Sequence, residues 1–473
     1  MPKKPNLIYI FADQLRLQSC GYAGDEKAKT PNIDQFAAQG VDFSNAVSCT
    51  PVCAPYRASL FTGKYTSSTG MVINELRINP NHRCFAHVLH DHDYDVGYIG
   101  KWHLWANQAG HHHDQQNAYV PPGPHRLGFD GYWAGYNFHH EYYGAYYYGD
   151  DPQKVEVDGY EPDTQTDLAI EYIQAKANKE NPFAMFLSWG PPHDPWRKEN
   201  VPEEYYEMFR EIEFTLPPNW RDTPDPYMDQ NTDPERWLSY WKRNIPEFLR
   251  VYYAMNANLD WNFGRLLSAI DKAGLADNTI VVFTSDHGEM FGANGRVNKL
   301  IFYEDACRVP FLMRWPEQIP AGHISDACLG TPDIMPTILS LMGLPYPQEV
   351  EGSDLSHLAL GKNGPEPQAA FLQGMGHTFL EKDGTEWRAL RDKQYTYAIY
   401  RVDQSELLFD HQQDPFQMQN LAADPAYQET VEYFRSLLQD KMSELNDTFE
   451  KCTWYLDHWI ENREIMQAAK GKF

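Results

Sequence analysis

The chain has 473 residues, 42% of them hydrophobic and 14% aromatic, which is enough for one large α/β domain with a smaller domain beside it. This composition excludes disorder as the starting expectation. The net charge is −26, from 40 basic and 66 acidic side chains, and it argues against nucleic acid and anionic membranes as partners. An anionic small substrate would require basic residues gathered in one place.

The seven cysteines are odd in number and scattered, so they do not suggest a disulfide framework. The first apolar run is too short for a signal peptide and stops at Asp13. No run reaches membrane-spanning length. We therefore expect a cytoplasmic protein, or a periplasmic or secreted one if a leader has been removed from the sequence.

Four apolar segments are predicted to form strands, and each ends in polar residues. The first, 7-LIYIFAD-13, is a nearly continuous hydrophobic run of the kind found in buried parallel strands. The four segments with their terminal polar residues are 7–13 with Asp13 and Gln14, 94–103 with Lys101 and His103, 183–195 with His193, and 280–289 with Asp286 and His287.

Segments with helical signals lie between these strands. One begins at Thr30-Pro31 and closes at Gly40, a second covers 247–270, and a third begins at Pro332. Strands alternating with helices predict an α/β fold with a large mixed, mostly parallel sheet sandwiched by helices. Ligands of such sheets bind beyond the carboxyl ends of the strands, so the polar clusters should form one active site.

The sequence changes character after about residue 360. The stretch 361-GKNGPEPQ-368 has the composition of a linker, and strand-like pieces follow at 387–401 and 406–410. An amphipathic helix is predicted around 430–446. We therefore expect a catalytic α/β domain at 1–365 and a smaller α+β subdomain at 366–473.

The segment 48-SCTPVCAPYRASLFTG-63 places a cysteine at the start of a predicted helix. Pro55 suits the first helical turn, so Cys53 should lie near the N-cap, where free amides and the helix dipole favour an anion. Arg57 lies one turn further on and has a planar fork suited to an oxyanion. A structural zinc site would need a second Cys or His pair, and none is near. On this segment alone, a buried thiol and a nucleophile both stay open.

The same segment resembles the signature of the type I sulfatases, the formylglycine-dependent members of the alkaline phosphatase superfamily. The signature residues are matched at Cys53, Pro55, Arg57, Thr62 and Gly63, while Tyr56 stands where small residues are more usual. In that family the cysteine is oxidised after translation to formylglycine, whose hydrate is the nucleophile. The resemblance implies an alkaline-phosphatase-like fold, a sulfuric-ester hydrolase and a formylglycine-generating maturase as partner. It extends to 331–345 and 406–422.

Asp13 and Gln14, with Asp286 and His287, form two polar pairs at the ends of two apolar strands. Such residues are often only caps, but oxygen-rich ligands suit a hard divalent cation. The resemblance implies one metal ion held by these four residues and by position 53. Sulfatases hold calcium, usually with an Asp where Gln14 stands. Ca²⁺ is therefore favoured, and Mn²⁺ or Mg²⁺ stays open.

Lys101 and His103 lie in the run GKWH, His193 in PPHDP and Lys299 in KLIFYED. Each taken singly is more simply a surface lysine or a core histidine. The resemblance implies that Arg57, Lys101 and Lys299 neutralise the sulfate oxygens together with the cation. It also implies that His193, with Lys299, protonates the departing alcohol. His103 would take a proton from the hydrate, and Asp286 is a candidate base for the first step.

Two other functions stay open. The Asp13-Gln14 pair is also similar to that of the phosphonate monoester hydrolases and choline sulfatases of the superfamily. A phosphonate monoester or phosphodiester hydrolase is therefore the alternative, although the Gly-Lys-Trp-His run favours sulfate. The third function is a non-catalytic sulfated-glycan binder whose Cys53 is never oxidised.

The expected substrate is a sulfated small molecule, most simply a sulfated saccharide. This follows from the habit of the resembling family and from the aromatic stretch 132–151, which either packs in the core or stacks on sugar rings. The run His111–His113 either binds a metal or forms a polar loop near the site entrance.

Overall fold

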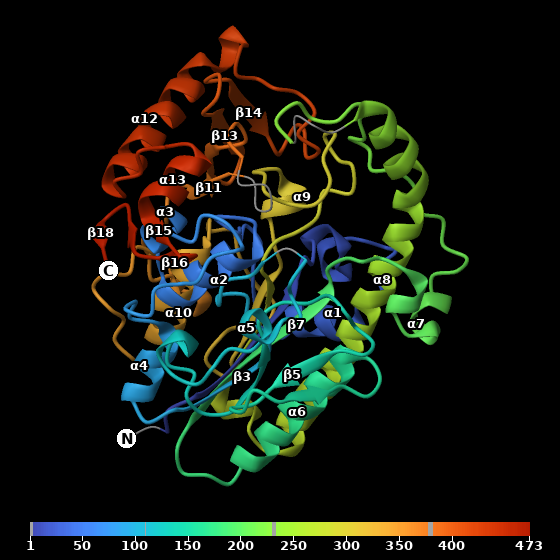
Figure 1. Cartoon of the computed structure of the whole chain (residues 1–473), viewed down its shortest axis with the longest axis vertical. Coiled ribbons are helices and arrows are strands. Elements are labelled where there is room, and N and C mark those ends of the chain that lie inside the picture. Colours follow the sequence, from blue (N-terminus) through green and yellow to red (C-terminus); the bar gives the residue numbers. More distant parts are fainter. Residues whose placement is uncertain (1–2, 109, 229–232, 377–381) are drawn as a thin grey trace.

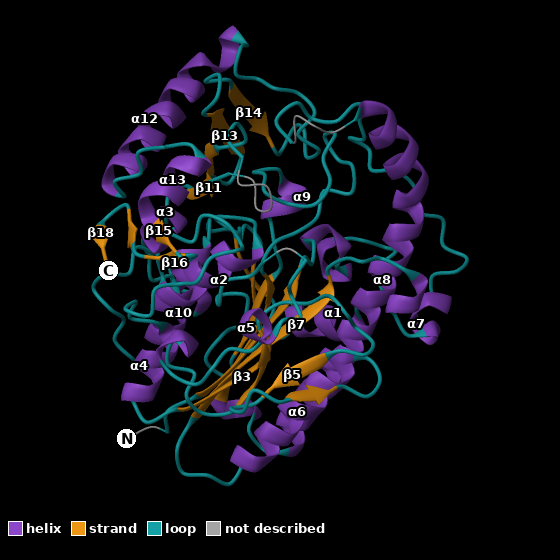
Figure 2. Cartoon of the chain, in the orientation of Figure 1, coloured by secondary structure: helices purple, strands orange, loops and turns teal. Residues whose placement is uncertain are grey.

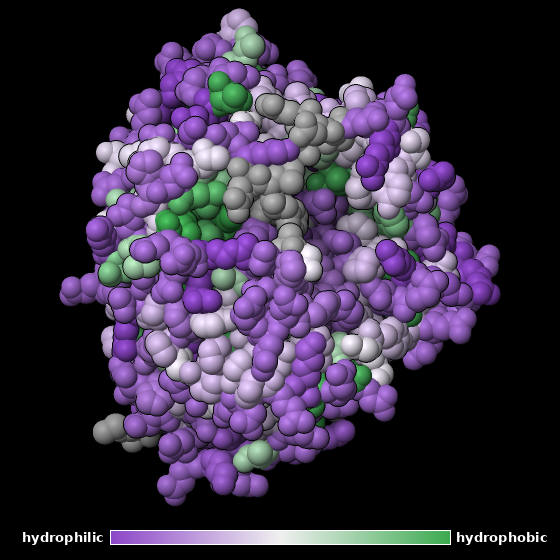
Figure 3. Space-filling view, in the orientation of Figure 1, coloured by the Kyte–Doolittle hydropathy of each residue, from purple (hydrophilic) through white to green (hydrophobic). Residues whose placement is uncertain are grey.

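The computed structural model describes residues 3–108, 110–228, 233–376 and 382–473. A ten-stranded mixed sheet with helices on both faces forms the larger part, and a four-stranded antiparallel sheet lies toward the C-terminus (Figures 1 and 2). The predicted class, a large mostly parallel sheet between helices with a smaller α+β part, is confirmed. On the face shown in Figure 3, hydrophilic side chains predominate.

The four strands predicted from the sequence are neighbours in the large sheet. Its order is β10-β2-β9-β8-β1-β7-β3-β4-β5-β6, and the strands from β8 through β4 all run parallel. The strands are β1 Asn6–Asp13, β2 Val41–Phe43, β3 Asp95–Lys101, β4 Trp133–Tyr136, β5 Tyr146–Tyr148, β6 Lys154–Glu156, β7 Phe183–Pro192, β8 Thr279–Ser285, β9 Phe311–Arg314 and β10 His323–Ser325.

Side chains of β1 alternate between two cores, as the period of a strand requires. Ile8 and Ile10 pack under one set of helices, α1, α6 and α8, whereas Tyr9 and Phe11 pack under α2, α4 and α10. The helices are α1 Pro31–Ala38, α2 Cys53–Thr62, α3 Thr66–Thr69, α4 Phe85–Asp91, α5 Gln115–Ala118, α6 Glu161–Lys176, α7 Glu203–Glu207, α8 Pro234–Lys272, α9 Glu304–Cys307, α10 Ile334–Leu341, α11 Ser356–Ala359, α12 Gln428–Glu444 and α13 Cys452–Trp459.

Helix α8 is longer than the predicted 247–270. It starts at Pro234, with the Asp233 side chain accepting from the amides of Glu235 and Arg236, and it contains Pro246. The predicted segment starts directly after Pro246, a residue type that normally interrupts a helix. The cap at Asp233 and the proline at the first helical position set the start of α8, and Pro246 does not end the helix.

The small sheet has the order β11-β12-β13-β14, and α12 covers one of its faces. The predicted strand 387–401 is in fact two strands, because the Asp392 carboxylate accepts from the amides of Gln394 and Tyr395 and turns the chain. The division at 365/366 stays a prediction. The strands are β11 Ala370–Gly374, β12 Trp387–Arg391, β13 Tyr395–Tyr400 and β14 Glu406–Asp410.

The last residues run back to the first third of the chain. Arg77 donates its amide to the Arg463 carbonyl, and Ala469 donates to the Ser67 carbonyl. Two short hairpins are formed there by β15 Ile460–Glu461, β16 Glu464–Ile465, β17 Gln467–Ala468 and β18 Gly471–Lys472. Over the described ranges, each helix is too short or too polar to cross a membrane.

Candidate active site

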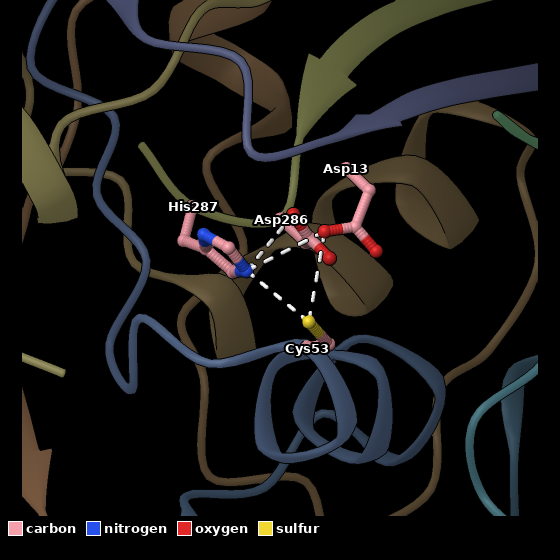
Figure 4. A group of neighbouring side chains, drawn as sticks. All are labelled: Asp13, Cys53, Asp286 and His287. Atoms are coloured by element: carbon pink, nitrogen blue, oxygen red, sulfur yellow. Dashed lines mark hydrogen bonds and ion pairs between the residues drawn. The ribbon is translucent and has the colours of Figure 1, made fainter. Parts of the chain in front are cut away.

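The carboxyl ends of four neighbouring strands meet the N-terminus of α2 at one edge of the large sheet. Asp13 is the last residue of β1, Lys101 the last of β3, His193 follows β7, and Asp286 follows β8. Cys53 is the first residue of α2 and faces these strand ends (Figure 4). The topology therefore brings together polar residues that lie far apart in the sequence.

Local backbone features aim the side chains into the site. The register of β1 against β7 shifts between Ala12 and Asp13, and Gln14 has a φ of 71°. A bulge at a strand end turns side chains that would otherwise alternate regularly. Gly100, before Lys101, has a φ of 99°, and a Cβ there would lie 2.0 Å from the Ser188 carbonyl oxygen. Only glycine lets β3 approach β7 this closely.

Four buried donor atoms converge at the centre of the site (Figure 4). The Cys53 Sγ lies 3.6 Å from Asp13 Oδ1 and 3.3 Å from His287 Nε2. His287 Nε2 is 3.6 Å from one oxygen of each aspartate, Asp13 and Asp286. Carboxylate and imidazole donors gathered this closely could hold a divalent cation.

His287 is held in the form that a metal ion requires. Its Nδ1 lies 2.9 Å from the Gly288 carbonyl oxygen, so Nδ1 carries the hydrogen and Nε2 keeps a free lone pair toward the carboxylates. Burial and the nearby Lys299 ammonium hold the pKa of His287 well below its usual value. A neutral imidazole with this tautomer fits a divalent cation.

The pKa values of the two aspartates are shifted in opposite directions although the residues share the site. Burial would raise the pKa of Asp13, but Lys101 and Arg57 outweigh it and hold that pKa below its usual range. Burial and the charge on Asp13 raise the pKa of Asp286. Two buried carboxylates this close ionise together only when more positive charge is present, which a divalent cation would supply.

Three buried cations surround the carboxylates, although the chain as a whole is acidic. Lys101 Nζ is 2.5 Å from Asp13 Oδ2, and Arg57 Nη2 lies 3.2 Å from Asp13 and 3.4 Å from Asp286. Arg57 is fixed by further bonds to the Lys101 carbonyl and the Ser188 hydroxyl. The third cation, Lys299, is 2.5 Å from Gln14 Oε1. This grouping creates a local positive field suited to an anion.

Gln14 is held by a residue that the motifs did not identify. Its Nε2 donates to Glu289 Oε2 at 2.7 Å, so its Oε1 faces Lys299. Glu289 in turn accepts from the amides of Phe291 and Asn298. The signal in the sequence was only the acidic residue of the DHGE run.

The two histidines assigned to proton transfer are buried and neutral. Lys299 Nζ lies 2.6 Å from His193 Nε2, and His193 Nδ1 lies 3.0 Å from the Asp194 carbonyl oxygen. Burial first, then lysine charges, lower the pKa of both His193 and His103. Neither ring nitrogen of His103 has a hydrogen-bond partner among the residues that the structure describes. The ten residues predicted for this site thus lie around one point in the structure.

Part of the aromatic stretch 132–151 packs in the core, and its stacking on sugar rings stays a prediction. Tyr136, Tyr146 and Tyr148 form a buried cluster, whereas the rings of Phe138 and His140 contact those of His103 and His193. The run His111–His113 bonds separately to Asp114, Asn107 and Tyr146, as a polar loop would.

Tyr56 packs in the core and is not one of the side chains that converge on Cys53. Its hydroxyl lies 3.3 Å from that of Tyr9, and its ring packs near Phe11 in the core below the site. Cys53 is itself buried, and burial and Asp13 raise the pKa of its thiol to about 12. Burial thus favours the neutral thiol of an unmodified Cys53 over the thiolate.

The comparisons with known proteins agree along almost the whole chain. The family model described as Sulfatase matches residues 5–344, and a model described as N-sulphoglucosamine sulphohydrolase, C-terminal, matches residues 292–445. An ulvan-active sulfatase of Formosa agariphila is 37% identical over 96% of this chain and 84% of its own length. An N-acetylglucosamine-6-O-sulfatase of Bacteroides thetaiotaomicron is 27% identical over 95% of this chain and 89% of its own.

Solved structures show the same likeness. The Bacteroides fragilis sulfatase yidJ is 31% identical with a TM-score of 0.81, covering 96% of this chain and 97% of that one. A phosphonate monoester hydrolase of Silicibacter pomeroyi is 21% identical with a TM-score of 0.74, covering 94% of this chain and 96% of that one. At that identity the second likeness concerns the fold alone.

Proposed function

The chain belongs to the sulfatase family of the alkaline phosphatase superfamily, and from this premise we propose that it removes sulfate from a saccharide with a formylglycine made from Cys53 and one divalent cation. Family membership makes the chain a sulfuric-ester hydrolase. The nucleophile, the metal and the saccharide are the proposed parts. They are supported chiefly by the convergence of Cys53 on two carboxylates and a neutral imidazole inside a ring of three cations.

Asp13, Gln14, Asp286 and His287 would hold the cation together with position 53. The ion supplies positive charge next to the nucleophile, which favours an oxyanion there at neutral pH. Ca²⁺ is the favoured ion because four of the five side chains offer oxygen once Cys53 is formylglycine. Mn²⁺ and Mg²⁺ stay as alternatives. The Cys53 Sγ occupies the place that the formylglycine oxygens would take.

Arg57, Lys101 and Lys299 are proposed to hold the sulfate group. All three are buried and already fixed by neighbouring groups, so little reorganisation is needed when charge develops on the sulfate oxygens. Because this positive charge is concentrated in the site, an acidic protein can still bind an anionic ester.

Proton transfer is proposed for His193, Lys299 and His103. Lys299 donates to His193 Nε2, so this pair has a proton available for the ester oxygen as the S–O bond breaks. His103 is neutral, and its ring nitrogens have no hydrogen-bond partner within the part of the chain that the structure describes, so it would accept the proton that the nucleophile releases when sulfate departs. Asp286 is the candidate base for the first step. Overall, water adds across the S–O bond to give an alcohol and sulfate.

The substrate class is inferred from relatives. Their names refer to ulvan and to N-acetylglucosamine 6-O-sulfate, which supports a sulfated saccharide for this chain. A formylglycine-generating maturase is the proposed partner, since Cys53 must be oxidised by another protein.

The first test combines mass measurement with activity. Protein produced with a maturase should carry the aldehyde or its hydrate on the peptide that contains Cys53, and it should cleave aryl sulfates. Cys53→Ala should lose at least about 10³-fold in kcat. Cys328→Ala, which removes another buried thiol, is the matched control and should keep activity. Full activity in Cys53→Ala would overturn the proposal.

The alternative is phosphonate monoester or phosphodiester hydrolysis, which the uncharged Gln14 favours. Matched aryl sulfate and aryl phosphonate esters separate the two reactions, and we expect the sulfate to be the faster substrate. Binding of a sulfated saccharide without turnover, by protein with a confirmed aldehyde, would instead indicate a non-catalytic glycan binder.

A further inference from the structure

The loop between β4 and β5 places two side chains against the histidines assigned to proton transfer. The rings of His140 and His193 have centroids 3.9 Å apart and planes at 38°. The Phe138 centroid lies 4.6 Å from that of His140 and 4.4 Å from that of His103. This loop therefore lies against the side chain, His193, that is proposed to protonate the leaving alcohol together with Lys299.

His140 carries a buried polar atom that lacks a partner. Its Nε2 makes no hydrogen bond with any residue of the described ranges. Buried polar groups in proteins are normally paired, so an unpaired one beside a reaction site points to a ligand. Burial, then His193 and Lys101, hold the pKa of His140 well below its usual value, which leaves a neutral ring. A neutral imidazole suits a hydroxyl better than an anion.

A metal ion is a poor occupant for the same cluster, although His140, His193 and Asp194 lie close together. His193 Nε2 already accepts from the Lys299 ammonium, and its Nδ1 hydrogen points to the Asp194 carbonyl. Neither nitrogen of His193 is therefore free to bind a cation, and the Lys299 charge would repel one.

We propose that His140 binds a hydroxyl of the leaving saccharide, on the ring carbon next to the sulfate ester. The inference rests on the proposed function and adds the substrate group, a neighbouring hydroxyl, that the site would recognise. A hydroxyl on the adjacent carbon lies within a hydrogen bond's length of the ester oxygen, and His140 lies directly against the residue that protonates that oxygen. An aryl sulfate has no such hydroxyl. His140 would thus favour sugars over aromatic esters, because a buried group built for a hydroxyl rejects ligands that lack it.

The test is a thermodynamic cycle in which the His140 side chain and the substrate hydroxyl are removed separately and together. Methyl hexopyranoside monosulfates serve as probes, each paired with the analogue that lacks the hydroxyl next to the sulfate. His140→Phe keeps a ring against His193 but removes the nitrogens, and His140→Asn keeps a polar group. We expect wild type to prefer the parent sugar in kcat/KM by roughly tenfold to a hundredfold, and His140→Phe to lose most of that preference.

His113→Ala is the matched control, since His113 lies in the neighbouring loop and is bonded to Tyr146 and Glu141. It should keep the full preference. An equal preference for the parent sugar in wild type and in His140→Phe would overturn the role of His140. So would a loss of kcat/KM in His140→Phe that is equally large for sugars and for aryl sulfates, because the ring would then only support His193.

Binding separates this inference from the proposed function. The same sugar pairs can be titrated calorimetrically into Cys53→Ala and into Cys53→Ala/His140→Phe, where no turnover is needed. A preference for the parent sugar that disappears with His140 supports the inference even if hydrolysis fails. Hydrolysis of sugars without any such preference overturns the inference alone, and no binding of any sulfated sugar overturns both.

Discussion

Gln14 is uncharged at a position that would face the cation, and Glu289 compensates for this by fixing its orientation. The Gln14 amide ends in an oxygen and a nitrogen, and only the oxygen can bind a metal ion. Because Glu289 Oε2 accepts from Nε2 at 2.7 Å, the oxygen is turned toward the site. Partners of metal ligands act in this way by orienting the donor atom.

Glu289→Gln should therefore weaken metal binding while leaving the loop intact. The new side chain can still accept from the amides of Phe291 and Asn298 through its oxygen, but its NH₂ would oppose the NH₂ of Gln14. We expect the affinity for Ca²⁺, measured by calorimetric titration of chelator-treated protein, to fall about tenfold to a hundredfold. The swap Gln14→Glu with Glu289→Gln restores a donor–acceptor pair and should recover the affinity. Unchanged affinity in Glu289→Gln would show that Gln14 needs no such partner.

The residues that were predictable from the sequence differ physically from those that were not. Asp13, Lys101 and Asp286 stand at or directly after ends of buried strands, and parallel strands bring such ends to one edge whatever the loops do. His140 and Glu289 lie on loops, where position depends on tertiary contacts such as the stacking on His193 and the bond to Gln14. No period or spacing in the sequence encodes those contacts.

At the scale of elements, the start of α6 buries a carboxyl group behind the site. Glu161 is 1% exposed, and its Oε1 lies 3.8 Å from His139 Nε2. Burial raises the pKa of Glu161 from 4.5 to about 8. Between those two values the folded protein holds a proton that the unfolded chain has released.

Stability should therefore fall as the pH rises through this window and level off above pH 8. The contribution of Glu161 is at most about 1.4 kcal/mol per pH unit. Glu161→Gln removes the titration, so its Tm should fall less than that of wild type between pH 5 and pH 8, and the variant should be the more stable protein at the upper end. Glu171→Gln, on the exposed side of the same helix, is the control and should follow wild type. Parallel curves for Glu161→Gln and wild type would mean that Glu161 is ionised in the folded state.

Strands and helices were predictable from the sequence where the local residue pattern and the tertiary contacts favour the same element. The strands β1, β3, β7 and β8 are continuous apolar runs, and the structure has them within a few residues of the predicted bounds. The strands β15 through β18 were missed because each has only two residues, too few to show the period of a strand. The five-residue strand β11 was also missed. Where the two hairpins pack depends on distant contacts, such as that of Arg463 with Arg77, which joins parts of the chain nearly 400 residues apart.

At the scale of the whole molecule, a buried ion pair joins the small sheet to the large domain. Arg391 on β12 binds Glu304 of α9 through two bonds, Nε to Oε1 at 2.7 Å and Nη2 to Oε2 at 3.0 Å. Removing one partner leaves the other buried and uncompensated, so Arg391→Met should cost about 3–5 kcal/mol in denaturant unfolding. Arg435→Met breaks a pair with Glu406 that is partly exposed and should cost less than about 1 kcal/mol.

The double variant Arg391→Met/Glu304→Leu should recover most of the stability, because it removes both charges. We also expect wild type to unfold in one transition, since this pair and a shared apolar cluster tie the two parts together. Two separate transitions would indicate that the segment from 366 folds independently.

The molecule as a whole is negatively charged, whereas three cations gather in its site. The effects of these two charges on substrate binding can be separated by changing the ionic strength. The net charge of −26 repels a polysulfated chain at a distance, whereas Arg57, Lys101 and Lys299 are buried and act only at short range. Raising the salt concentration from about 0.01 M to about 0.15 M shortens the Debye length from about 30 Å to about 8 Å, which screens the distant repulsion but not the buried cations. We therefore expect kcat/KM for a polysulfated oligosaccharide to rise severalfold with salt while kcat stays constant. A monosulfated sugar, with one charge, should respond less. A kcat/KM that falls with salt would mean that basic residues around the pocket steer the substrate and outweigh the charge of the rest of the surface.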